Sequence, residues 1–179
     1  CAEIQSQLVT AYINQRLYDK AQMVINKYPK FPIMQSQLIS IYIEKWKESA
    51  KEKMLDEAEQ KAKEFSEYLP IQSQLITIYM LKGEYDKAEK LAKRFPNYAP
   101  IQSQLVTIYI KKWKDEEAVK IADNFKWYEP IQEQLLELYM NQNNFKKAKE
   151  IADFMPHSKI IKNKIKYSDN YTSMPQTAR

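Results

Sequence analysis

The polar residues that could do chemistry in this sequence recur four residues apart. Ser73 and Thr77 form a hydroxyl pair of this kind, and Glu133 and Glu137 form a carboxylate pair. Residues four apart lie on one face of a helix, so the hydroxyls could hydrogen-bond a ligand and the carboxylates could act as acid and base. A carboxylate pair at this spacing is more often surface charge. We therefore interpret these positions as a binding face rather than a catalytic one.

The counts of Cys, His and Gly exclude several kinds of active site. The 179 residues include one of each. One Cys and one His cannot supply the usual ligands of a zinc site, which leaves only a carboxylate metal site open. Gly83 alone cannot build a glycine-rich phosphate loop, and His157 has no partner near it in the sequence. We predict a protein that is not an enzyme and has no catalytic, metal or cofactor-binding residues.

The charge and hydropathy of the sequence bear on whether the protein binds membranes or nucleic acids. No apolar run approaches the roughly 18 residues that a membrane-spanning helix needs, so we expect no transmembrane segment. The net charge is +5, of which residues 157–179 carry +4. The rest of the chain is nearly balanced, which argues against a strongly basic nucleic-acid-binding face. The Lys159 to Lys166 cluster could still contact nucleic acid or an anionic membrane.

The first residue leaves the cellular compartment open. Because the chain begins with Cys1 rather than Met, we expect that it has been cut from a longer precursor or array. The simpler interpretation is a fragment of a longer array of repeats. The alternative is a bacterial lipoprotein anchored through Cys1 after removal of a signal peptide.

One phrase occurs five times and defines the elements that carry the hydroxyls. The phrase is IQSQL followed by apolar residues and a Tyr, and its leucine recurs at steps of 30, 37, 30 and 30 residues. These leucines are Leu8, Leu38, Leu75, Leu105 and Leu135. The apolar residues within a copy follow the spacing of a helix face, and a Pro such as Pro100 suits the first helical turn. Periods of this length are typical of helical repeat proteins.

A second apolar pattern follows a short polar turn in each copy, as at Ala88 and Ala92. Each copy is therefore predicted to be a helix-turn-helix whose apolar faces are buried by stacked neighbours. The fold class is all-α, with about five repeats, a C-terminal capping helix and a tail. The expected ranges are 4–32, 33–70, 71–100, 101–130 and 131–156 for the repeats, 157–169 for the cap and 170–179 for the tail.

The 37-residue step contains seven extra residues around Lys47 to Leu55. Seven residues make about two helical turns, so we expect the insertion to lengthen a helix while nearly preserving the direction of its faces.

The repeats resemble the tetratricopeptide repeat family. Leu75, Tyr79, Gly83, Tyr85 and Ala88 match its signature step by step. The other repeats replace the Gly by Arg16, Trp46, Trp113 and Asn143, and the 30-residue unit is shorter than the usual 34. The chain is thus tetratricopeptide-like. The resemblance implies a right-handed α-solenoid that binds a peptide or protein segment on its concave face.

The resemblance also assigns the hydroxyls to that concave face. We call the predicted binding surface the hydroxyl strip, which combines small hydroxyls with apolar residues at its edge. It comprises Ser36, Ser40, Ile43, Ser73, Thr77, Met80, Ser103, Thr107 and Ile110. Such a strip could accept an extended segment or a helix.

The first Gln of the phrase falls inside the apolar arc of its helix, as Gln102 does between Val106 and Tyr109. A buried amide needs partners. We expect Gln5, Gln35, Gln72, Gln102 and Gln132 to bond neighbouring Gln residues or backbone carbonyls, rather than to contact ligands.

Three functions follow from these features. The leading hypothesis is a non-enzymatic scaffold for a protein or peptide partner. The first alternative is an RNA-binding helical repeat protein in which each unit reads a base, although the positions that would read bases barely vary. The second alternative is a structural segment of a longer repeat array.

Overall fold

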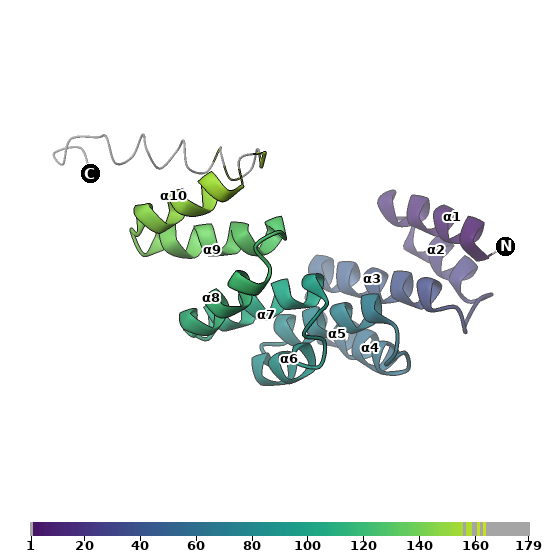
Figure 1. Cartoon of the computed structure of the whole chain (residues 1–179). Coiled ribbons are helices and arrows are strands. Elements are labelled where there is room, and N and C mark those ends of the chain that lie inside the picture. The colour runs from purple at the N-terminus through teal and green to yellow at the C-terminus, as the bar shows by residue number, and fades with distance from the viewer. Residues whose placement is uncertain (1, 156, 159–160, 162, 164–179) are drawn as a thin grey trace. The chain divides into compact units, whose positions relative to one another are not determined.

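The computed structural model describes residues 2–155, 157–158, 161 and 163 (Figure 1). These residues contain helices and no strand, which confirms the all-α prediction. The chain divides into two compact units, residues 1–94 and 95–179. We describe each unit by itself.

The first unit contains three helix pairs. Its helices are α1 (Ala2–Asn14), α2 (Tyr18–Ile25), α3 (Pro32–Ser49), α4 (Glu52–Lys63), α5 (Leu69–Leu81) and α6 (Tyr85–Ala92). The members of each pair, α1 with α2, α3 with α4 and α5 with α6, pack against each other. The second helix of a pair also contacts the first helix of the next pair, and α1, α3 and α5 pack in succession. Sequential packing thus buries the faces that a single pair would leave exposed.

The second unit repeats this arrangement with two pairs. Its helices are α7 (Ala99–Lys111), α8 (Asp115–Asn124), α9 (Glu129–Asn141) and α10 (Phe145–Phe154). The first helices α7 and α9 contact each other, and α8 contacts α9.

The core of each unit lies between the helices of a pair and its neighbours. The first helices contribute large side chains such as Ile71 and Ile101, whereas the second helices contribute Ala88, Ala118 and Ala122, all fully buried. The small alanines let two helix axes approach closely.

Proline and left-handed residues set the ends of the first helices. Pro lies in the first turn of α3, α5, α7 and α9, as the sequence predicts for the last three. A residue with positive φ follows the helix end in each pair. These residues are Arg16, Ala50, Gly83, Trp113 and Asn143, with φ between 53° and 74°. In the second repeat, Trp46 aligns with Gly83 in the sequence but lies inside the longer α3, and Ala50 takes the left-handed conformation instead.

The seven-residue insertion lengthens both helices of its pair. Ala50 lies 12 positions after Leu38, whereas Gly83 lies 8 positions after Leu75. The remaining three residues lie between Ala50 and the next repeat, where α4 has 12 residues against 8 in α6. The expectation of one longer helix is therefore corrected. About one turn is added to each of α3 and α4, so both helices keep the direction of their buried faces.

Deleting residues 47–53 should leave the fold intact, because the deletion removes these two turns together. It joins Trp46 to Met54 and produces IEKWMLDEA, which aligns with IKKWKDEEA from Ile110 to Ala118. Trp46 would then take the left-handed position that Trp113 occupies with φ 58°.

We expect a single cooperative unfolding transition for this deletion variant, with a free energy of unfolding within about 2 kcal/mol of the wild type. The lost Arg16–Glu48 ion pair is exposed and contributes little. Chemical denaturation followed by circular dichroism checks this. Loss of the cooperative transition would show that the extra turns are integral to the core.

The beginning of the predicted cap contacts α9 within the second unit. Ile161 is fully buried, and its backbone N–H donates to Ser158 Oγ at 3.1 Å. Ser158 Oγ in turn donates to Glu129 Oε1 on α9. The rest of the predicted cap, the Lys159 to Lys166 cluster, the tail over 170–179 and Cys1 lie outside the described residues, apart from Asn163.

Candidate functional site

The predicted hydroxyl strip falls on one face of the first helices. In the first unit, α3 carries Ser36, Ser40 and Ile43, and α5 carries Ser73, Thr77 and Met80. In the second unit, α7 carries Ser103, Thr107 and Ile110. All of these side chains are half-buried except Ile43, which is buried. Because α3 packs against α5, the structure brings those two parts of the strip together.

Gln74 on α5, the first helix of the following pair, forms hydrogen bonds with Ser36 and Ser40 of α3. Gln74 Nε2 donates to the backbone oxygen of Ser36 at 2.9 Å and to Ser40 Oγ at 2.8 Å. Ser36 Oγ donates back to Gln74 Oε1 at 3.0 Å. One amide thus binds two hydroxyl residues that lie one turn apart on the neighbouring helix.

The same arrangement recurs in the second unit. Gln134 Nε2 donates to Ser103 Oγ at 2.7 Å, and Thr107 Oγ1 donates to Gln134 Oε1 at 2.9 Å. Near the start of the chain, Gln37 Nε2 donates to the backbone oxygen of Ser6 at 2.8 Å and to Thr10 Oγ1 at 2.9 Å. The hydroxyl pairs therefore take part in packing successive first helices.

Sequence reasoning missed the role of this second Gln of the phrase. The signal was present, because Gln7, Gln37, Gln74, Gln104 and Gln134 occupy the same place in all five copies. A half-buried amide that recurs beside a recurring hydroxyl pair has the donors and acceptor to bind both.

The first Gln of the phrase has the structural role that the sequence predicts in α3, α5, α7 and α9. Gln72 Nε2 donates to the backbone oxygen of Phe65 at 3.0 Å, and Gln102 Nε2 donates to that of Phe95 at 3.0 Å. Gln132 Nε2 reaches two carbonyls, Ala122 O at 2.9 Å and Phe125 O at 3.3 Å. Backbone carbonyls, one of the two kinds of partner expected, accept hydrogen bonds from these three glutamines. These bonds fix the connection between one pair and the next.

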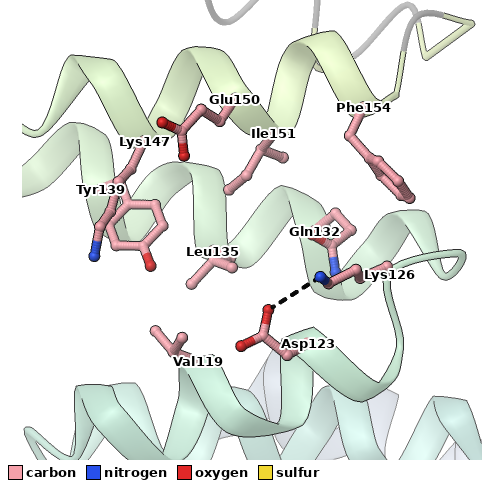
Figure 2. Close-up of a pocket in the computed structure, with 10 residues that line it drawn as sticks. All are labelled: Val119, Asp123, Lys126, Gln132, Leu135, Tyr139, Lys147, Glu150, Ile151 and Phe154. Carbon is pink, nitrogen blue, oxygen red and sulfur yellow. Dashed lines mark ion pairs between the residues drawn. The ribbon is translucent and has the colours of Figure 1, made fainter.

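A pocket of about 360 Å³ opens between α8, α9 and α10 of the second unit (Figure 2). Val119 and Asp123 line it from α8, and Leu135 and Tyr139 line it from α9. Lys126 and Asp123 form an ion pair at 3.7 Å at its edge. The sequence did not single out this pocket.

The first unit has a charged cluster between α4 and the end of α5. Lys82 Nζ lies 2.6 Å from Glu59 Oε2 and 2.8 Å from Asp56 Oδ1, and Lys63 Nζ lies 2.6 Å from Glu59 Oε1. Hydrogen bonds to Asp56 and Glu59 raise the pKa of Lys82. Burial by itself raises the pKa of Glu59, but the hydrogen bonds from Lys63 and Lys82 outweigh it and hold this pKa below its ordinary value. The cluster is a charged contact between neighbouring pairs.

The described residues contain no group of three or more His, Cys, Asp and Glu side chains placed to bind a metal ion. Within the same part of the chain, every helix is too short or too polar to cross a lipid bilayer.

Comparison with known proteins gives no relative from which a function could be transferred. No protein-family model matches the chain. A search of curated protein sequences also returns no match.

Proposed function

We propose that the chain is a non-enzymatic scaffold that binds a peptide or protein segment on the hydroxyl strip. In this proposal the helix pairs form a right-handed, tetratricopeptide-like α-solenoid, and the strip lies on its concave face. The observation that carries the proposal is the cross-helix hydrogen bonding of the strip. Gln74 and Gln134 each hold side chains of the neighbouring helix in one arrangement.

A surface that is ordered before binding loses less conformational entropy when a partner docks. The strip supplies half-exposed hydroxyl and amide groups beside the half-buried apolar side chains of Met80 and Ile110. Hydroxyl and amide groups can bond the backbone of an extended segment, and an apolar edge can hold its side chains. This combination suits a peptide better than a polyanion.

The sharpest test places charge on the apolar edge and leaves the hydroxyls untouched. Thr107 is unsuitable for this purpose, because its hydroxyl bonds Gln134 and its replacement would also weaken helix packing. We therefore choose the double variant Met80→Arg, Ile110→Arg. The matched control is Asn97→Arg, Asn124→Arg, which adds the same charge at exposed positions outside the strip.

The wild type, the strip variant and the control serve as baits in affinity purification from the native source, with and without nuclease. Thermal unfolding first establishes that all three are folded. We expect the wild type and the control to retain the same protein partners after nuclease treatment, and the strip variant to lose them at least tenfold. Undiminished retention by the strip variant would contradict the proposal. Partners that disappear with nuclease and bind the strip variant more tightly at low salt would indicate RNA binding instead.

A further inference from the structure

The pocket of the second unit lies beside positions of α8 whose equivalents in α4 and α6 form a salt bridge. The position that follows the buried alanine of the second helix is Glu59 in α4 and Glu89 in α6. Each glutamate bonds a lysine one turn later, Lys63 and Lys93, at 2.6 Å. The side chains of the two glutamates are only 13% and 11% exposed. In these repeats an ion pair therefore fills the position beside the buried alanine.

In α8 the corresponding residues are Val119 and Asp123. Valine is shorter than glutamate and cannot form the ion pair, and Asp123 instead pairs with Lys126. The second unit thus has a pocket at a position that charged side chains occupy in the first unit.

The buried residues that line this pocket are mainly apolar, with the Gln132 amide among them, and its edge is charged. Leu135 and Ile151 are 5% and 8% exposed, and Tyr139 is 8% exposed. Lys147 Nζ lies 5.0 Å from the centre of the Tyr139 ring, and within the described residues it has no carboxylate within ion-pair distance. Figure 2 shows Val119 across the opening from Leu135. An apolar floor with a few polar groups at its edge is typical of sites that bind apolar groups.

The charges at the edge balance, because Asp123 and Glu150 oppose Lys126 and Lys147. A balanced edge attracts neither an anion nor a cation as such. Charged side chains of both signs can bond the N–H and C=O groups of a peptide backbone. The apolar floor would then receive the side chain that this backbone carries.

We propose that this pocket binds a bulky apolar side chain, that of leucine, methionine or phenylalanine, carried by a peptide segment. The site is separate from the hydroxyl strip. Leu135 and Tyr139 face the pocket, whereas Glu133 and Glu137 lie on the other side of α9. A partner could therefore use this site with or without the strip, and the two proposals can fail independently.

The test uses the full chain and two small probes. N-acetyl-leucinamide presents the apolar side chain between two peptide groups, and N-acetyl-asparagine amide presents a polar side chain of similar shape. Binding is followed through the NMR signals of the Val119, Leu135 and Ile151 methyl groups. We expect saturable shifts with the leucine probe, with a dissociation constant on the order of 1 mM for a ligand of about 12 non-hydrogen atoms.

The variant Val119→Glu, Asp123→Lys installs in α8 the ion pair that α4 and α6 contain. It should close the pocket, remain folded and bind the leucine probe at least tenfold more weakly. If it does not unfold cooperatively, Val119→Gln serves instead, because Gln22 occupies this position in α2. The strip variant Met80→Arg, Ile110→Arg should bind the leucine probe as the wild type does.

Three results would overturn the proposal. The first is the absence of saturable shifts in the wild type. The second is equal binding of the leucine and asparagine probes, since the apolar floor would then contribute nothing. The third is undiminished binding to the folded variant whose pocket is closed.

Discussion

Replacing Leu105 by alanine is expected to lower the free energy of unfolding by roughly 2–5 kcal/mol, and Leu75→Ala should have a similar effect. These leucines are 3% and 5% exposed, so truncation removes buried methyl groups and leaves a cavity in the core. Urea unfolding followed by circular dichroism measures the change.

Leu8 supplies a matched control, because it occupies the same place in the first copy of the phrase but is 39% exposed. Leu8→Ala should cost about 1 kcal/mol or less, as expected for a side chain that already contacts water. If Leu8→Ala and Leu105→Ala had equal effects, intrinsic helix propensity rather than burial would set the cost. A loss below about 1 kcal/mol for Leu105→Ala would show that this position is not part of the core.

The period of the sequence predicts the helices well, because each element repeats a strong local pattern. Apolar spacing, a proline in the first turn and a polar turn recur in nearly every copy, so the pairs could be placed without any knowledge of their packing. The sequence leaves the end of the first helix undetermined where the period changes. Trp46 aligns with the residue that ends the other first helices, but two extra turns move that end to Ala50. Nothing in the local sequence fixes how seven residues divide between two helices.

The candidate site was only partly predictable for a related reason. The hydroxyl pairs are visible in the sequence, but their partners depend on how far one helix is displaced along its neighbour. Gln74 reaches Ser36 and Ser40 because α3 and α5 pack at a particular offset. The pocket was missed because Val119, read alone, resembles an ordinary core residue. Only comparison with Glu59 and Glu89, which form salt bridges at the same position, indicates that Val119 leaves a pocket there.

The different roles of the buried Gln132 and the half-buried Gln134 can be tested by replacing each with glutamate. Gln132 is 4% exposed and donates to two backbone carbonyls. Gln132→Glu keeps the shape of the side chain but replaces the donating NH₂ group with a carboxylate oxygen. At neutral pH this would bury an unpaired negative charge against two carbonyl oxygens. We expect a loss of roughly 3–5 kcal/mol in the free energy of unfolding.

The pH dependence of this loss in unfolding free energy follows from the direction in which the pKa of the introduced carboxyl shifts. Burial should raise the pKa of the introduced carboxyl above its unfolded value of about 4.3. The loss should therefore be full above the raised pKa and shrink as the pH falls toward 4, where the protonated carboxyl can donate to one of the two carbonyls.

Gln134→Glu is the matched control on the same helix, because Gln134 is half-buried and lies beside the hydroxyls of Ser103 and Thr107. Both hydroxyls can rotate to donate to a carboxylate, so this variant should lose about 1 kcal/mol or less and show little dependence on pH. Urea unfolding of both variants between pH 4 and pH 8 measures the two losses and their pH dependence. Equal losses at neutral pH would mean that the carbonyl contacts of Gln132 do not hold the connection between α8 and α9.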